Sequence, residues 1–152
     1  MKIRFMEEAE RLALNSPCIR RKYGVVITKD NNIISTGYNT RVGHCCENGV
    51  CVRDRYKNLN GSKIEQGAEL HAEIIALFNL KNDFDSIYLA GFDNNGKILK
   101  GSACRSCYYC AMALKYKGFT YIIVRGDNGE LESINIGAIL EEWEQAWEEL
   151  YA

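Results

Sequence analysis

The sequence has few histidines, almost no proline and no long apolar run, and its charges nearly cancel. Only two histidines and one proline occur among 152 residues, and the net charge is −1. No apolar run approaches the ~20 residues of a membrane-spanning helix, and residues 1–8 lack the apolar region of a signal peptide. The basic stripe that long nucleic acids require is also missing. We therefore expect a cytoplasmic protein with a small-molecule substrate, and neither a membrane nor a nucleic acid polymer as partner.

The composition is that of an ordinary globular domain. Apolar residues make up 47% of the chain and charged residues 26%, and a chain of this length buries one hydrophobic core. There is no internal repeat, low-complexity tract or linker, so we expect one domain over residues 1–152. The seven cysteines are an odd number and several lie near a histidine, which favours metal binding in a reducing compartment over a disulfide framework.

Hydrophobic periodicity predicts four helices and four strands around a long irregular segment. The predicted helices are 5–14, 68–80, a cysteine-rich helix that ends at 117 before Gly118, and one from 137 onward. The predicted strands are 23–28 and 33–39, joined as a hairpin, 85–92 and 120–125. Residues 40–67 lack periodicity, which is typical of a functional loop. This order fits an α/β fold with a mixed sheet between helical layers.

The strongest chemical signal is a histidine with a carboxylate two residues later, followed by regularly spaced cysteines. His71 and Glu73 open one apolar helix, and Cys104, Cys107 and Cys110 open another. One imidazole and two thiolates make three zinc ligands, and a catalytic zinc leaves its fourth position to a water whose pKa falls towards ~7. Glu73 would then be a proton carrier that is not a ligand. A core histidine, a structural zinc knuckle or a redox pair are the alternatives, but the joint pattern matches the signature of the zinc deaminases.

The chain as a whole resembles the cytidine and deoxycytidylate deaminase superfamily, and most of all its deoxycytidylate (dCMP) deaminase branch. The resemblance extends from about residue 16 to residue 125 and is most specific at 18–27, 37–39, 46–54, 71–73 and 107–111. It implies a three-layer α/β/α fold with a five-stranded mixed sheet, Zn²⁺ as cofactor, and deamination of dCMP to dUMP and ammonia. Members specific for dCMP are commonly homohexamers, so the resemblance also implies a homo-oligomer.

The resemblance also implies roles for single residues. His71, Cys107 and Cys110 would hold zinc, and Asn39 would contact the sugar. Glu73 would take a proton from water, protonate ring N3 and then deliver a proton to the departing ammonia.

Two cysteine pairs have the spacing that zinc requires, Cys104 with Cys107 or Cys107 with Cys110. We favour the later pair, because the interval from Cys110 to Gly118 matches the family's distance between its second cysteine and the glycine that ends the helix. The chain departs from the family at the residue before the first cysteine, where Ser106 replaces a proline, or Ala103 does if Cys104 leads.

Two further sets of residues are open to more than one interpretation. Arg20, Arg53 and Arg55 either bind the phosphate of a nucleotide, which suits arginine, or belong to a solvated surface. A second group, Cys18, His44, Cys45, Cys46 and Cys51, forms either a structural second zinc site or a set of reduced cysteines with a surface histidine.

Other functions compete with dCMP deamination. A deaminase of another small base, nucleoside or nucleotide is the nearest alternative. A zinc-binding assembly module without catalysis is a different class, and Glu73 counts against it, because a structural site needs no adjacent proton carrier.

Overall fold

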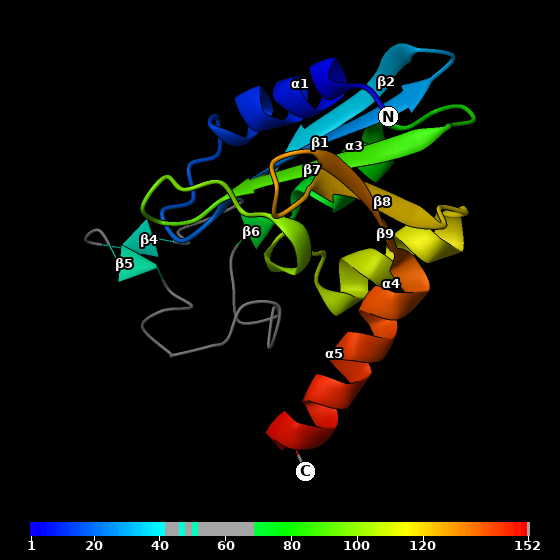
Figure 1. Ribbon diagram of the computed structural model, residues 1–152. Helices are drawn as coiled ribbons and strands as arrows, with labels where there is room; N and C mark the ends of the chain where they lie inside the picture. The colour runs from blue at the N-terminus through cyan, green and yellow to red at the C-terminus, as the bar shows by residue number, and fades with distance from the viewer. Residues whose placement is uncertain (42–45, 48–49, 52–68, 152) are drawn as a thin grey trace.

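The computed structural model describes residues 1–41, 46–47, 50–51 and 69–151. Its main sheet has five strands in the order β2-β1-β7-β8-β9, in which only β7 and β8 pair in parallel (Figure 1). These strands are β1 Lys22–Lys29, β2 Asn32–Tyr38, β7 Ser86–Phe92, β8 Tyr121–Arg125 and β9 Leu131–Asn135. The helices are α1 Ile3–Ala13, α3 Ala72–Asn79, α4 Tyr108–Lys117 and α5 Ile136–Tyr151.

Alternating side chains divide the sheet into two buried faces. Val25 and Ile27 of β1 belong to one core cluster and Val26 to the other, because successive residues of a strand point to opposite faces. Helix α1 covers the second face, while α3, α4 and α5 supply apolar side chains to the first (Figure 1). This arrangement confirms the predicted three-layer α/β/α fold.

The fifth strand of the sheet is the one that periodicity did not find. β9 is an edge strand that pairs only with β8, and its residues are exposed or half-buried. An edge strand with little burial has no apolar alternation to detect, so residues 131–135 escaped the prediction, although the family resemblance implied five strands.

Two predicted helix starts were wrong, and both corrections affect the candidate site. The helix predicted from residue 68 begins at Ala72, because Glu69–Leu70 form a short strand, β6, that pairs with β3, Thr40–Arg41. The cysteine-rich helix begins only at Tyr108, after a 3₁₀ turn at Gly101–Ala103. It ends as predicted at Gly118, whose φ of 115° is the left-handed conformation of a helix C-cap.

The two helices nearest the hairpin approach it at glycines. A Cβ on Gly24 would lie 2.0 Å from the carbonyl oxygen of Ala9 in α1, and one on Gly37 would lie 2.5 Å from the carbonyl oxygen of Ala72 in α3. Neither backbone atom is free to give way. Gly37 thus sets how closely the start of α3 packs on the sheet. No helix in the described part of the chain is both long and apolar enough to cross a bilayer.

We predict that Gly24→Ala lowers the free energy of unfolding by about 2 kcal/mol or more, because the added methyl group forces α1 away from β1. Urea unfolding followed by circular dichroism measures the change. Lys115→Ala, at an exposed position of α4, is the control and should change the stability by less than ~0.5 kcal/mol. Equal stability of the two variants would contradict the packing described here.

Candidate active site and metal centre

The residues at the centre of the site lie at the N-termini of two helices. His71 is the N-cap residue of α3 and Cys107 is the N-cap residue of α4, and both have extended backbone conformations. Leu70, immediately before His71, is paired with Thr40, so a β-bridge fixes the chain where it enters α3. In this arrangement the histidine and the cysteine face each other from elements that are distant in sequence.

His71, Cys107 and Cys110 have the geometry of a metal site. Nδ1 of His71 lies 3.4 Å from Sγ of Cys107 and 3.5 Å from Sγ of Cys110, and all three donor atoms lie within 4.8 Å of one another. Tetrahedral zinc, with Zn–N near ~2.05 Å and Zn–S near ~2.3 Å, requires a nitrogen–sulfur separation of ~3.6 Å. Among the described residues this is the only group of three such donors, and we call these three residues the metal group. The donor set therefore fits zinc in both chemistry and distance.

The two sulfurs differ in how readily they ionise. The hydrogen bond from Cys110 lowers the pKa of Cys107, and His71 lowers it further. The same hydrogen bond between the two sulfurs raises the pKa of Cys110. The backbone N–H of Cys110 also points to Sγ of Cys107, at 3.5 Å, and the positive end of α4 favours a thiolate there. Metal binding requires thiolates, so it would release the proton that the pair shares.

Cys104, the alternative ligand, lies apart from this group. It is fully buried, and its Sγ approaches the carbonyl oxygen of Leu89 in β7 at 3.7 Å. Burial raises the pKa of Cys104 to about 12, which keeps it a neutral thiol. The structure thus brings Cys107 and Cys110, and not Cys104, to His71.

Glu73 lies in the first turn of α3 and is only 4% exposed. Its Oε2 accepts a hydrogen bond of 2.7 Å from the Ser106 hydroxyl. Burial raises the pKa of Glu73 and the negative charge of Cys107 raises it further, against the opposing effects of His71 and Ser106. A buried carboxyl group with a raised pKa beside a metal group is suited to taking up and releasing protons.

Asn39 lies at the same end of the sheet. It is 2% exposed, and its amide joins the backbone at two points, with Oδ1 accepting from the N–H of Tyr23 at 2.8 Å and Nδ2 donating to the carbonyl of Arg21 at 2.9 Å. The next residue, Thr40, pairs with Leu70, so Asn39 is close to His71 along the β3–β6 bridge.

Burial raises the pKa of Tyr23 to about 12 and the hydrogen bond from Arg21 opposes this rise, while Cys104 and Glu73 add to it. Tyr23, near the start of β1, is thus close enough to Glu73 for the charge of that carboxylate to affect it. Arg20, two residues before β1, is half-buried.

Several predicted site residues lie outside the described residues. These are His44, Cys45, Arg53 and Arg55. Cys46 and Cys51 are Cα partners in the short pair of β4, Cys46–Glu47, and β5, Val50–Cys51, and Cys18 is buried. The second zinc site and the phosphate contacts of the central loop stay predictions.

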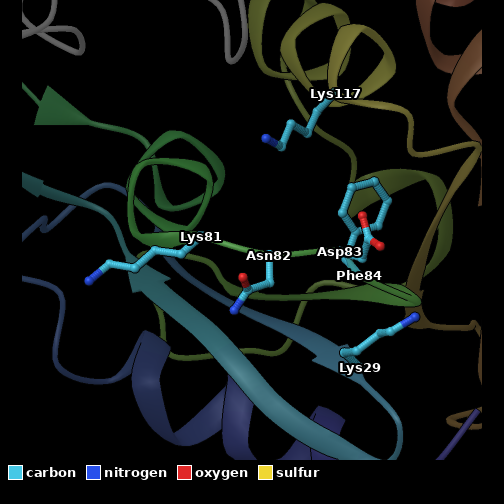
Figure 2. Close-up of a pocket in the computed structure, with 6 residues that line it drawn as sticks. All are labelled: Lys29, Lys81, Asn82, Asp83, Phe84 and Lys117. Atoms are coloured by element: carbon cyan, nitrogen blue, oxygen red, sulfur yellow. The ribbon is translucent and has the colours of Figure 1, made fainter.

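A separate hollow lies at the opposite ends of α3 and α4. It is lined by Lys29, Lys81, Asn82, Asp83, Phe84 and Lys117 (Figure 2). Residues 81–84 follow α3 and Lys117 ends α4, about 12 Å along the helices from the metal group. In Figure 2 the side chains of Lys81 and Lys117 extend to the left and that of Lys29 to the right, and Lys29 is paired with Asp85 at 3.5 Å. This hollow has no part in the metal group.

In the sequence Ser106 stood out only as a replacement for proline, and Trp143 only belonged to the helix predicted from residue 137 onward. Trp143 of α5 donates a 2.8 Å hydrogen bond from Nε1 to the Ser106 carbonyl. The replacement itself was the available signal, because serine has a hydroxyl that proline lacks.

Comparison with known proteins agrees with the fold and the donor set. The family model of the cytidine and deoxycytidylate deaminase zinc-binding region matches residues 1–125. Deoxycytidylate deaminase of Schizosaccharomyces pombe is 30% identical over 123 residues, which cover 78% of this chain. The chain spans about a third of that relative, 35% of its length.

Solved structures show the same fold at low identity. Cytidine deaminase from Burkholderia pseudomallei has a TM-score of 0.59 and 15% identity, and the match covers 91% of this chain and 95% of that one. The cyanophage S-TIM5 dCMP deaminase, solved with dCMP and dUMP, has a TM-score of 0.55 and 20% identity, with 83% and 84% covered.

The fold is that of the cytidine deaminases, and the His/Cys₂ donor set fits zinc. The chain belongs to the cytidine and deoxycytidylate deaminase family. Its zinc-binding region includes the group His71, Cys107 and Cys110.

We predict that Cys107→Ser and Cys110→Ser each reduce bound zinc by one ion per chain, because each removes a thiolate from a three-donor site. Cys104→Ala, which deletes a buried neutral thiol, should keep the full zinc content and lower stability by about 1 kcal/mol. Elemental analysis of purified protein measures zinc per chain, and a wild-type value of two would support the second site. Zinc loss in Cys104→Ala together with full zinc in Cys110→Ser would reverse the ligand choice.

Proposed function

We propose that the protein is a zinc-dependent deaminase that converts dCMP and water to dUMP and ammonia. The observation that carries this proposal is the buried carboxyl group of Glu73 next to the metal group. A purely structural zinc site gains nothing from a buried acid, whose desolvation costs several kcal/mol when it ionises. A hydrolytic deaminase needs an acid there.

The residues divide the work as follows. His71, Cys107 and Cys110 would hold zinc, which when bound lowers the pKa of a water molecule towards ~7. Glu73 accepts the proton that this water loses as its oxygen bonds to C4 of the pyrimidine, and passes it to ring N3. Glu73 then takes the proton of the hydroxyl now bonded to C4 and passes it to the amino group, so that the C4–N bond breaks, ammonia leaves and a C4 carbonyl forms. The raised pKa of Glu73 makes its carboxylate a better proton acceptor than that of an exposed glutamate.

Substrate recognition would come from the end of the sheet that borders the metal group. Asn39 would contact the sugar and Arg20 the phosphate, with Arg53 and Arg55 of the central loop as further phosphate ligands. The 30% identity to a deoxycytidylate deaminase over 78% of the chain supports dCMP over an unphosphorylated nucleoside. We further propose one domain over residues 1–152 and a cytoplasmic location.

We predict that zinc-loaded protein releases ammonia from dCMP, with much lower kcat/KM for cytidine and deoxycytidine, because these lack the phosphate. The measurement is ammonia release over a panel of cytosine bases, nucleosides and nucleotides. Glu73→Gln, which keeps the size of the side chain but removes the acid, is the matched control and should lose about 10³-fold or more in kcat while retaining zinc. Turnover of cytidine without dCMP would move the activity to nucleosides, and unchanged turnover in Glu73→Gln would refute the role of Glu73.

We also propose that the chain forms a homo-oligomer, with a hexamer as the form to test first. Three apolar side chains one helical turn apart, Tyr109, Met112 and Tyr116, are 53%, 41% and 96% exposed along α4, which supports burial of this face by another copy. Light scattering should give a multiple of the 17.3 kDa chain mass. Tyr116→Glu should lower the mass and Lys115→Ala should not. A monomeric wild-type protein at micromolar concentration would contradict the proposal.

A further inference from the structure

Ser106 connects the candidate general acid–base residue to the C-terminal helix. Its hydroxyl donates to Oε2 of Glu73 at 2.7 Å, and its carbonyl oxygen accepts from Nε1 of Trp143 at 2.8 Å. Ser106 is 1% exposed and Trp143 is 6% exposed, so water competes little for either bond. Two successive contacts therefore lead from α5 to the Glu73 carboxylate.

The contact at Glu73 restricts how its carboxylate is oriented. Because Oε2 is bonded to Ser106, rotation of the carboxylate is limited and Oε1 is kept in one direction. A carboxylate that moves a proton between a bound water and a ring nitrogen must keep its oxygen atoms within hydrogen-bond reach of both. A misplacement of about 1 Å can cost about 100-fold in rate.

Ser106 is itself held in place from its other side. Trp143, whose indole contacts the Ser106 carbonyl, is covered by the Arg105 guanidinium, 3.7 Å above its ring. Arg105 in turn pairs with Glu142 of α5 at 2.7 Å. The loop before Cys107 is thus fixed to one turn of α5, a helix outside the family-matched residues 1–125.

We propose that Ser106 is a positioning residue for Glu73, and that Trp143 holds Ser106 where its hydroxyl reaches the carboxylate. This inference rests on the proposed deaminase function. It assigns a role to a serine that takes the place of the family's proline, and to a helix beyond the family's matched region.

The first test is steady-state kinetics of Ser106→Ala on zinc-loaded protein with dCMP. Removal of the hydroxyl should lower kcat by about 10- to 100-fold. KM should stay within about threefold and zinc per chain should be unchanged, because the Ser106 hydroxyl bonds to Glu73, which is not one of the proposed zinc ligands. Ser102→Ala, at an exposed serine in the 3₁₀ turn of the same loop, is the matched control and should behave as wild type.

Two further variants separate positioning from packing. Ser106→Thr keeps a hydroxyl and should recover most of the kcat lost in Ser106→Ala. Trp143→Phe keeps an aromatic ring over the core but removes the N–H, and should lower kcat less than Ser106→Ala does, again at unchanged zinc. A wild-type kcat in Ser106→Ala, or a zinc loss that fully accounts for its lower kcat, would overturn the proposal.

A structural readout keeps this inference separate from the proposed function. Crystal structures of the wild type, Ser106→Ala and Ser102→Ala should show the Glu73 carboxylate displaced or rotated only in Ser106→Ala. An unmoved carboxylate in Ser106→Ala overturns the positioning role even if no substrate is turned over. A displaced carboxylate in a protein inactive on the whole substrate panel would support the contact and refute the deaminase assignment instead.

Discussion

The meeting of two helix N-termini is the constraint on which the site depends. His71 lies 36 residues before Cys107 in the sequence, yet its Nδ1 lies 3.4 Å from the sulfur of Cys107 and 3.5 Å from that of Cys110. Such separations persist only if both helix ends are fixed. Gly37 lets the start of α3 contact β2, and the Ser35 hydroxyl donates to the Ala76 carbonyl at 2.6 Å. Sheet packing therefore determines the donor geometry.

The burial of Glu73 has a cost that stability alone does not explain. A carboxyl group 4% exposed loses most of its hydration, and the Ser106 hydroxyl, a backbone N–H and the nearby imidazole only partly replace it. An apolar side chain at this position in the first turn of α3 would pack without that penalty. The acid is thus a functional feature, and its closeness to Cys107 means that the charge on the metal ligands and the proton affinity of Glu73 are linked.

Much of the fold and of the metal group was predictable from sequence, because both depend on local patterns. Apolar patterns identified four of the five strands of the main sheet, β1, β2, β7 and β8. The spacing of His71 and Glu73, with the later cysteines, identified the donors. β9 was missed because an exposed edge strand carries no alternation. The pair of short strands before His71 was missed because two-residue bridges are set by tertiary pairing, which no local pattern records. The preference for Cys110 over Cys104 came from the interval to Gly118, and the structure adds that Cys104 Sγ lies against the Leu89 carbonyl of β7.

The hydrogen bond between Ser106 and Trp143 of α5 is also not predicted by any sequence motif, but for a different reason. Proline at the residue before the first ligand cysteine fixes the backbone φ by its ring, whereas serine leaves that angle to its surroundings. In this chain the surroundings include the Trp143 indole, which holds the Ser106 carbonyl from α5. Loop rigidity that a ring would supply locally is here supplied by a helix 37 residues away, and the serine gains a hydroxyl for Glu73. The replacement and the tryptophan therefore act together, since serine without the indole would leave the loop less restrained.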